Sequence, residues 1–387
     1  MFSRRTAWSG APNAIAQALE ARRATGEPVL DLTETNPTRV GLPTPEPEIR
    51  AALDEARALR YEPTPWGQPL ARSAVAAYLH AAVPPEHIML TASTSEAYAW
   101  LFKLLGDSGD RVLAPVPCYP LIEYLAGLEG LESTPYPWTW EEGGWFIDFT
   151  ALEDRLDDRT KAVVIVSPNN PTGAMVRREE LDRLLGICRD RRVAIIADEV
   201  FSDYVFNDST SRVRTLAGRE DALVFVLGGL SKACLLPQLK AAWIAASGPA
   251  RLLDSALARL EIVADTYLSV GTPVQMALPR LLALGDRIRR PLNARLAANR
   301  SRLMEALSGS AATPLSCDGG WSAVVRVPRH PAEEQRTVRL LTRHGLRVHP
   351  GFFFDFPTEA FLAVSLLVPE DDFARGVAIL AADADSA

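Results

Sequence analysis

Short apolar runs and amphipathic helical patterns follow one another through the middle of this chain. Six runs are rich in Val, Ile, Leu and Ala and short enough to be strands; they cover residues 87–92, 111–114, 162–166, 193–197, 222–227 and 241–247. Helical patterns accompany them at residues 93–105, 179–191 and 251–265. This order predicts an α/β fold, in which a mostly parallel sheet is sandwiched by helices.

The two ends of the chain have a different pattern. Residues 9–26 predict a short helix, 29–32 a strand and 48–59 a second helix, with a turn-rich loop of Thr, Asn and Pro in between. After residue 287, helical and strand-like segments are mixed: a charged helix, a strand at 321–327, a helix at 333–344 and strands at 346–349 and 361–367. This mixture is typical of an α+β unit.

Composition narrows the class of protein. A length of 387 residues favours two or so domains, and 48% hydrophobic with 23% charged residues is typical of a soluble enzyme. The net charge of −7, without a basic cluster, argues against a nucleic-acid partner. No apolar run approaches the roughly 18 residues that span a bilayer, and no apolar segment follows the starting MFSRRTAWSG, so we expect a cytoplasmic protein without a membrane partner.

Cysteine and histidine spacing predicts no metal site. The four cysteines lie far apart without a CxxC pair, and the five histidines show no ligand spacing. A disulfide framework is not expected either.

Three of the strand-like runs end in residues that carry chemistry. The run 162–166 leads into SPNNPTG with Asn170, 193–197 leads into Asp198, and 222–227 leads through two glycines to Lys232. Open α/β sheets bind ligands at the carboxyl ends of their strands. Taken singly, each residue has an ordinary alternative: a turn asparagine, a capping or surface acid, or a solvated lysine.

Together, these three motifs resemble the class I and II aminotransferase family. In the lysine motif, Ser231-Lys232 is followed by Pro237, Lys240 and Trp243. The resemblance implies the type I fold of aspartate aminotransferase-like enzymes, with pyridoxal 5′-phosphate (PLP) as cofactor. It also implies a small domain made by residues 1–47 and 287–387 and a large PLP-binding domain made by 48–286.

The resemblance assigns roles to the strand-end residues. It implies that Lys232 forms a Schiff base with the cofactor aldehyde and that Asn170 donates to the phenolic oxygen. Asp198 would face the protonated pyridine nitrogen, which compensates a carboxylate that burial would otherwise neutralise. Lys232 and Asp198 are therefore the predicted catalytic residues.

Further cofactor contacts follow from the same resemblance. A helix begins after Ser93, with Glu96 three residues later as in a capping box, and helix N-termini bind anions. The phosphate would be held there by Ser93, Thr94 and Ser95, and by Ser231 and Lys240 of the lysine motif. Tyr119 would stack on the pyridine ring, and Tyr61 would reach the phosphate of the partner subunit, which implies a homodimer with shared active sites.

Four positions depart from the family's pattern. Phe201 stands where most members have a tyrosine, Lys240 replaces an arginine, and Gly229 replaces a serine. Ala363 occupies the place of the arginine that clamps the substrate α-carboxylate. We predict that Arg39 and Asn36, in the turn-rich loop near the N-terminus, contact the substrate instead.

The sequence favours a PLP-dependent aminotransferase that moves an amino group between an amino acid and a 2-oxo acid. A PLP lyase or decarboxylase, an aminotransferase for substrates that lack the usual α-carboxylate contact, and an idle ligand sensor remain alternatives. A nucleotide-dependent oxidoreductase is disfavoured because neither GxGxxG nor GxxxxGK[ST] occurs.

Overall fold

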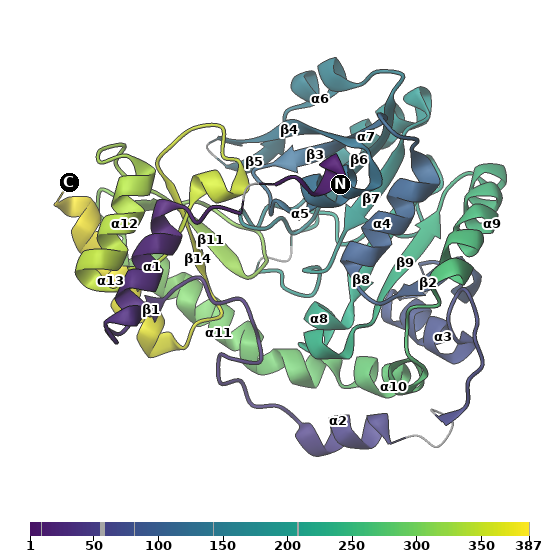
Figure 1. Ribbon diagram of the computed structural model, residues 1–387, viewed down its shortest axis with the longest axis horizontal. Helices are drawn as coiled ribbons and strands as arrows, with labels where there is room; N and C mark the ends of the chain where they lie inside the picture. The colour runs from purple at the N-terminus through teal and green to yellow at the C-terminus, as the bar shows by residue number, and fades with distance from the viewer. Residues whose placement is uncertain (9, 55–58, 81, 142, 207–208, 387) are drawn as a thin grey trace.

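The computed structural model describes residues 1–8, 10–54, 59–80, 82–141, 143–206 and 209–386. Within these ranges the central sheet has eight strands, in the order β2-β9-β8-β7-β6-β3-β4-β5. The strands are β2 (Ile88–Thr91), β9 (Ala242–Ser247), β8 (Val224–Gly229), β7 (Ala194–Asp198), β6 (Thr160–Val166), β3 (Arg111–Val116), β4 (Glu132–Glu141) and β5 (Gly144–Ile147). The five strands from β8 to β4 run parallel, whereas β2, β9 and β5 pair antiparallel with their neighbours. The predicted α/β class with a mostly parallel sheet is confirmed (Figure 1).

Both faces of the sheet are apolar, which explains its near-continuous hydrophobic runs. In β6, Val164 and Val166 pack into the cluster that contains α4 (Thr94–Leu105), α5 (Leu121–Glu129) and α9 (Ala250–Tyr267), whereas Val163 and Ile165 pack into the cluster on the opposite face. That second cluster includes α3 (Pro69–Tyr78), α6 (Phe149–Arg155), α7 (Arg178–Arg191) and α10 (Thr272–Ala283). Helices therefore cover the sheet on both sides.

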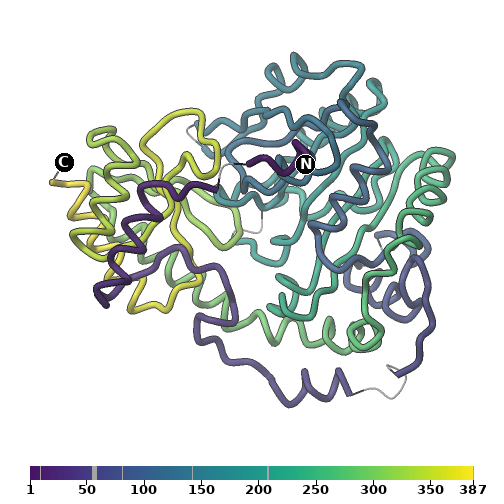
Figure 2. The backbone as a smooth tube through the Cα atoms, in the orientation of Figure 1, coloured from purple at the N-terminus to yellow at the C-terminus, as the bar shows by residue number. Residues whose placement is uncertain are grey.

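The chain ends meet in a second region. Helix α1 (Ala14–Ala24) packs on α12 (Glu333–His344), and β1 (Leu30–Asp31) pairs with β12 (Leu346–Arg347). A four-stranded antiparallel sheet lies beside them, made of β10 (Thr313–Pro314), β11 (Ser322–Arg326), β14 (Phe361–Ser365) and β13 (His349–Pro350), with α13 (Glu370–Asp385) near the C-terminus. Figure 2 shows the first and last parts of the chain side by side in this region.

One long helix, α11 (Gly285–Ala306), joins the two regions (Figure 1). The predicted domain boundary after residue 286 falls near its start, and the boundary after residue 47 falls inside α2 (Glu46–Leu53). Part of the predicted helix 48–59 lies outside the described residues, at 55–58. The division into domains at these positions stays a prediction.

Short helical turns also occur in the described part of the chain. They are the 3-10 turns η1 (Arg4–Thr6), η3 (Pro85–His87), η4 (Pro237–Leu239) and η5 (Gly351–Phe354), and the one-turn helix α8 (Leu230–Ala233). Two of these turns, α8 and η4, form the short connection between β8 and β9. Because the connection is short, β9 returns antiparallel beside β8.

Candidate active site

A cavity of about 390 Å³ opens at the carboxyl ends of the parallel strands. It is lined by residues of both regions of the molecule. Ten of the predicted cofactor residues line it: Ser93, Thr94, Ser95, Tyr119, Asn170, Asp198, Phe201, Ser231, Lys232 and Lys240. The sheet topology explains this gathering, because adjacent parallel strands end at the same edge.

Strand ends place the three central side chains. Asp198 is the last residue of β7, Asn170 follows the end of β6, and Lys232 lies in α8 directly after β8. The glycine pair before α8 allows close packing of β8 on β9, since a Cβ at Gly228 would lie 2.6 Å from Nε1 of Trp243. The position of Lys232 thus depends on this close approach.

The Asp198 carboxylate is held by two donors. Tyr98 Oη donates to Oδ2 at 3.2 Å, and the Val200 amide donates to Oδ1 at 3.2 Å. Burial raises the pKa of Asp198 to about 6, while these hydrogen bonds and the charge of Lys232 act in the opposite direction. A cation in the cavity would therefore stabilise the charged carboxylate.

The Lys232 amine is largely enclosed. Burial lowers its pKa, and the charge of Asp198 partly offsets this effect. Nζ lies 5.2 Å from the centre of the Trp321 ring and 5.9 Å from that of Phe201, so two aromatic rings border the amine. A lysine with a lowered pKa is more readily neutral, which both nucleophilic attack and proton transfer require.

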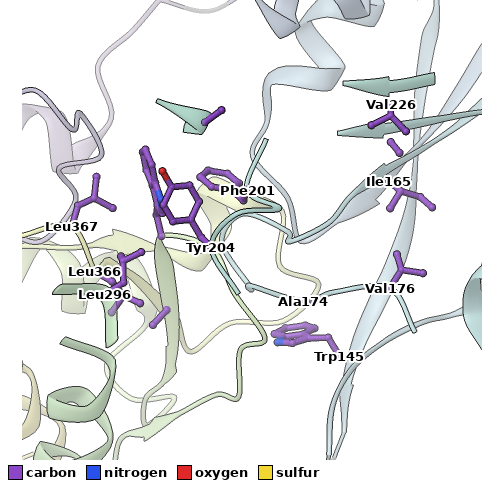
Figure 3. Close-up of a cluster of buried hydrophobic side chains, with 14 of the residues drawn as sticks. Trp145, Ile165, Ala174, Val176, Phe201, Tyr204, Val226, Leu296, Leu366 and Leu367 are labelled. Atoms are coloured by element: carbon purple, nitrogen blue, oxygen red, sulfur yellow. The ribbon is translucent and has the colours of Figure 1, made fainter. Parts of the chain in front are cut away.

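Tyr204 does not supply the phenol that Phe201 lacks. Its hydroxyl donates to the main-chain oxygen of Lys232 at 2.6 Å, and its side chain is buried. The rings of Phe201 and Tyr204 lie side by side, 6.5 Å apart between centres (Figure 3). Tyr204 therefore fixes the backbone that carries the lysine, and its hydroxyl is directed at that backbone.

Serine and threonine side chains surround the start of α4. Ser93 caps the helix, because its Oγ accepts from the Glu96 amide at 3.2 Å. In a capping box the Glu96 side chain would accept from the amide of the capping residue, Ser93. Here Glu96 Oε2 accepts instead from the Ala92 amide, one residue earlier, at 2.6 Å. With the helix dipole, the hydroxyls of Thr94 and Ser95 and the nearby Lys240 make this end of the cavity suitable for an anion.

Three predicted residues lie elsewhere. Tyr61 is exposed and lines a different cavity, and its contact with a second subunit stays a prediction. Arg39 is exposed and lines a third cavity together with Asp31 and Glu34. Asn36 uses its Oδ1 to accept from the amide and hydroxyl of Thr38. Substrate contact by Arg39 and Asn36 stays a prediction.

Five lining residues had no signal in the sequence. Tyr98 and Cys118 lie among apolar neighbours, and Thr35, Trp321 and Ser322 come from the region built by the chain ends. Ser322 Oγ lies 3.3 Å from Asn170 Oδ1, which joins the two regions across the cavity. Only the tertiary structure reveals these contacts: Trp321 and Ser322 are far from the motifs in sequence, and Tyr98, Cys118 and Thr35 lie close to predicted site residues but have no pattern that marks them as cavity lining.

Within the described ranges, no cluster of three or more His, Cys, Asp and Glu is placed to hold a metal, and no helix is long and apolar enough to cross a membrane. The four cysteines are buried and unpaired.

Known proteins resemble this chain in sequence and in fold. An alanine aminotransferase of Mycobacterium bovis is 32% identical over 201 residues, which cover 52% of this chain and 46% of that relative, so the match spans about half of the relative's length. A tyrosine aminotransferase of Bos taurus is 27% identical over 397 residues, covering 95% of this chain and 87% of the relative. The fold matches an alanine aminotransferase of Pyrococcus furiosus with a TM-score of 0.89 and 20% identity, over 100% of both chains.

The relatives named here are all aminotransferases, so the lyase and decarboxylase alternatives are not favoured. Residues 27–380 match the family described as aminotransferase class I and II. That match covers nearly the whole chain, and this protein belongs to the class I and II aminotransferase family.

Proposed function

We propose that this chain is a PLP-dependent aminotransferase that moves an amino group between an amino acid and a 2-oxo acid. The observation that carries the proposal is that the amine of Lys232 and the carboxylate of Asp198, both partly buried, line one cavity and act on each other through their charges. Family membership supports it, because enzymes of this class use PLP.

The residues of the cavity fit PLP chemically. The start of α4, with Thr94 and Ser95, and the cation of Lys240 suit a phosphate group. Asp198 suits a cationic ring nitrogen, since burial raises its pKa to about 6 and a cation would compensate the buried charge. Asn170 lies in the same lining, where its amide is available to a phenolic oxygen.

When bound, PLP supplies an electron sink for the electrons of a bond broken at the substrate's α-carbon. The chain's own residues supply the rest. Lys232 holds and moves a proton, because burial lowers the pKa of its amine and makes the neutral form more accessible. Asp198 keeps its charge through the hydrogen bonds from Tyr98 and Val200. Phe201 and Trp321 border the amine and limit the positions it can take.

We further propose that the chain works as a homodimer in which Tyr61 serves the partner's site, and that it acts in the cytoplasm. Exposure of Tyr61 on the surface of this chain supports the first part. Light scattering or cross-linking of the purified protein tests whether it is a dimer, and the activity of Tyr61→Phe tests whether this residue serves the partner's site. A monomeric parent protein with full activity would contradict the shared site.

The direct test of the reaction uses the purified, PLP-loaded protein and a pool of L-amino acids without any oxo acid. We expect the visible absorbance of the loaded protein to disappear and one equivalent of 2-oxo acid to form per site. The variant Lys232→Ala should form none. Release of carbon dioxide or ammonia without an equivalent of oxo acid would contradict transamination and support the lyase or decarboxylase alternative.

A further inference from the structure

The hydroxyl group of Tyr98 lies against the carboxylate of Asp198 inside the candidate active site. Tyr98 belongs to α4, is 1% exposed, and donates from Oη to Asp198 Oδ2 at 3.2 Å. The other oxygen, Oδ1, accepts from the Val200 amide at 3.2 Å. Two elements from different parts of the chain, α4 and the turn after β7, therefore hold the two oxygens of one carboxylate.

The direction of this hydrogen bond is fixed by chemistry. Burial and the nearby charge of Asp198 raise the pKa of Tyr98 well above 10, so its phenol stays protonated and acts as the donor. An ionised carboxylate has about four acceptor positions, of which two are used here. Positions remain on the carboxylate for a ligand.

Few other titratable groups face Asp198. Cys118 lines the same cavity, and burial raises the pKa of its thiol to about 12, so it stays neutral. Lys232 faces Asp198 with a pKa lowered by burial. Glu199 is the next residue, and burial raises its pKa to about 8. At neutral pH the donors from Tyr98 and Val200 thus act together with one cation, Lys232, to stabilise the charge of Asp198.

We propose that Tyr98 is a positioning residue for the cofactor: its hydroxyl keeps the Asp198 carboxylate charged and oriented for the ring nitrogen of PLP. This inference rests on the proposed function, because it requires a cavity that binds PLP. The contact of Tyr98 is with the carboxylate, so its effect on the cofactor is exerted through Asp198.

Loss of the Tyr98 hydroxyl should raise the pKa of Asp198. A hydrogen bond to a charged group is lost in Tyr98→Phe, which raises the pKa of Asp198 by about one to two units. Because the pKa of Asp198 already lies at about 6, the carboxylate of the variant is partly protonated at pH 7. The variant should then bind a cationic ring less tightly at pH 6 to 7 and recover at higher pH.

The test measures cofactor binding in the absence of catalysis. Pyridoxamine 5′-phosphate is titrated calorimetrically into the cofactor-free protein from pH 5.5 to 8.5, since this probe has no aldehyde and cannot react with Lys232. The measured quantity is the ratio of Kd between variant and parent at each pH, which cancels titration of the probe itself. We expect the Tyr98→Phe ratio to be about tenfold at pH 6.5 and to fall to a few-fold at pH 8.5.

Two controls separate positioning from packing. Tyr136→Phe removes a buried hydroxyl that donates to the Val164 main-chain oxygen at 2.8 Å, and Tyr78→Phe removes a partly buried hydroxyl that donates to Asp203 Oδ2 at 2.6 Å; neither residue lines this cavity. Both ratios should stay near one at every pH. A double-mutant cycle with Asp198→Asn adds a measurement that is independent of overall stability. Tyr98→Phe should have no further effect on Kd in that background.

A Tyr98→Phe ratio of one, or a ratio that is the same at every pH, would overturn the proposal, and so would an equal loss in the Asp198→Asn background. Failure of the parent protein itself to bind pyridoxamine 5′-phosphate would instead overturn the proposed function. The two failures are therefore distinguishable in one experiment.

Discussion

The carboxyl group of Glu199 provides a quantitative test of the electrostatics beside the active site. Glu199 is 6% exposed, and its Oε1 accepts from the Leu216 amide at 2.7 Å. Burial raises its pKa from 4.5 to about 8; hydrogen bonds from Thr215 and Leu216 oppose this rise, and the adjacent charge of Asp198 adds to it. Glu199 is therefore a neutral, protonated acid at pH 7.

The raised pKa of Glu199 makes the stability of the folded protein depend on pH. The folded protein binds the proton more tightly than the unfolded chain, so the associated stability is complete below pH 4.5 and is lost as pH rises through 8. The rise from 4.5 to about 8 is about 3.5 units, and at 1.36 kcal/mol per unit it corresponds to about 5 kcal/mol. Glu199→Gln keeps an acceptor for the Leu216 amide and cannot ionise, so the variant should not lose this stability.

The assay is urea unfolding of the cofactor-free parent and Glu199→Gln proteins at pH 5, 6, 7 and 8. The free energy of unfolding of the variant, relative to the parent, should increase by about 1.4 kcal/mol per pH unit in this range. Groups that do not interact with Glu199 titrate alike in both proteins and cancel in the difference; the adjacent Asp198, whose charge is coupled to that of Glu199, does not cancel fully. Glu220→Gln, at an exposed position, is the matched control for the exchange itself. A difference that stays constant from pH 5 to pH 8 would refute the reasoning.

Three further predictions concern the cavity wall, a closely packed glycine and a buried ion pair. Phe201→Tyr adds a phenol beside the Lys232 amine. A hydrogen bond from this phenol to the charged phenolic oxygen of bound PLP should lower the midpoint of the pH-dependent visible absorbance of the loaded protein by about 1–2 pH units. An unchanged midpoint would contradict this. Gly173→Ala should lower the free energy of unfolding in urea by about 2–4 kcal/mol, because φ is +68° and a Cβ would lie 2.4 Å from the main-chain oxygen of Gly319. Its control is Gly186→Ala in helix α7, where a Cβ meets nothing within 4 Å and the free energy of unfolding should rise by about 0.5–1 kcal/mol. Asp383→Ala should cost about 3–5 kcal/mol, since it leaves the fully buried guanidinium of Arg336 without its ion pair; a loss below 1 kcal/mol would show that the pair is dispensable.

The strand ends that carry chemistry could be predicted because each motif is local. A buried apolar run followed by a polar turn defines both the strand and the edge of the sheet at which its last side chain lies, as for Asn170 and Asp198. Parallel pairing then brings these residues together without further information. The predicted helix at 333–344 coincides with α12 for the same reason, since its pattern is regular and a glycine ends it.

The hairpin of β4 and β5 could not be predicted from the same rules. β4 contains Pro135 and Pro137, and proline normally excludes a central strand. Both are accommodated in the ladder with β3, close to the edge of the sheet. The predicted strand at 346–349 is divided between two sheets, because β12 pairs with β1 whereas β13 pairs with β14. Such choices depend on which partner is nearby, and local sequence does not contain that information.

The turn after β7 shows why neighbouring acids in one motif have different chemistry. Asp198 and Phe201 line the active-site cavity, whereas Glu199, Ser202 and Asp203 line a second cavity on the other side of the turn. Asp198 has Tyr98 and the Lys232 charge beside it and a pKa of about 6; Glu199, where hydrogen bonds from Thr215 and Leu216 only partly oppose the effect of burial, has a pKa of about 8. Because like charges on adjacent residues raise each other's pKa, a neutral Glu199 helps Asp198 to stay charged at pH 7. The burial of Glu199 thus has a functional consequence: the negative charge of the pair stays on the residue that faces the candidate cofactor site.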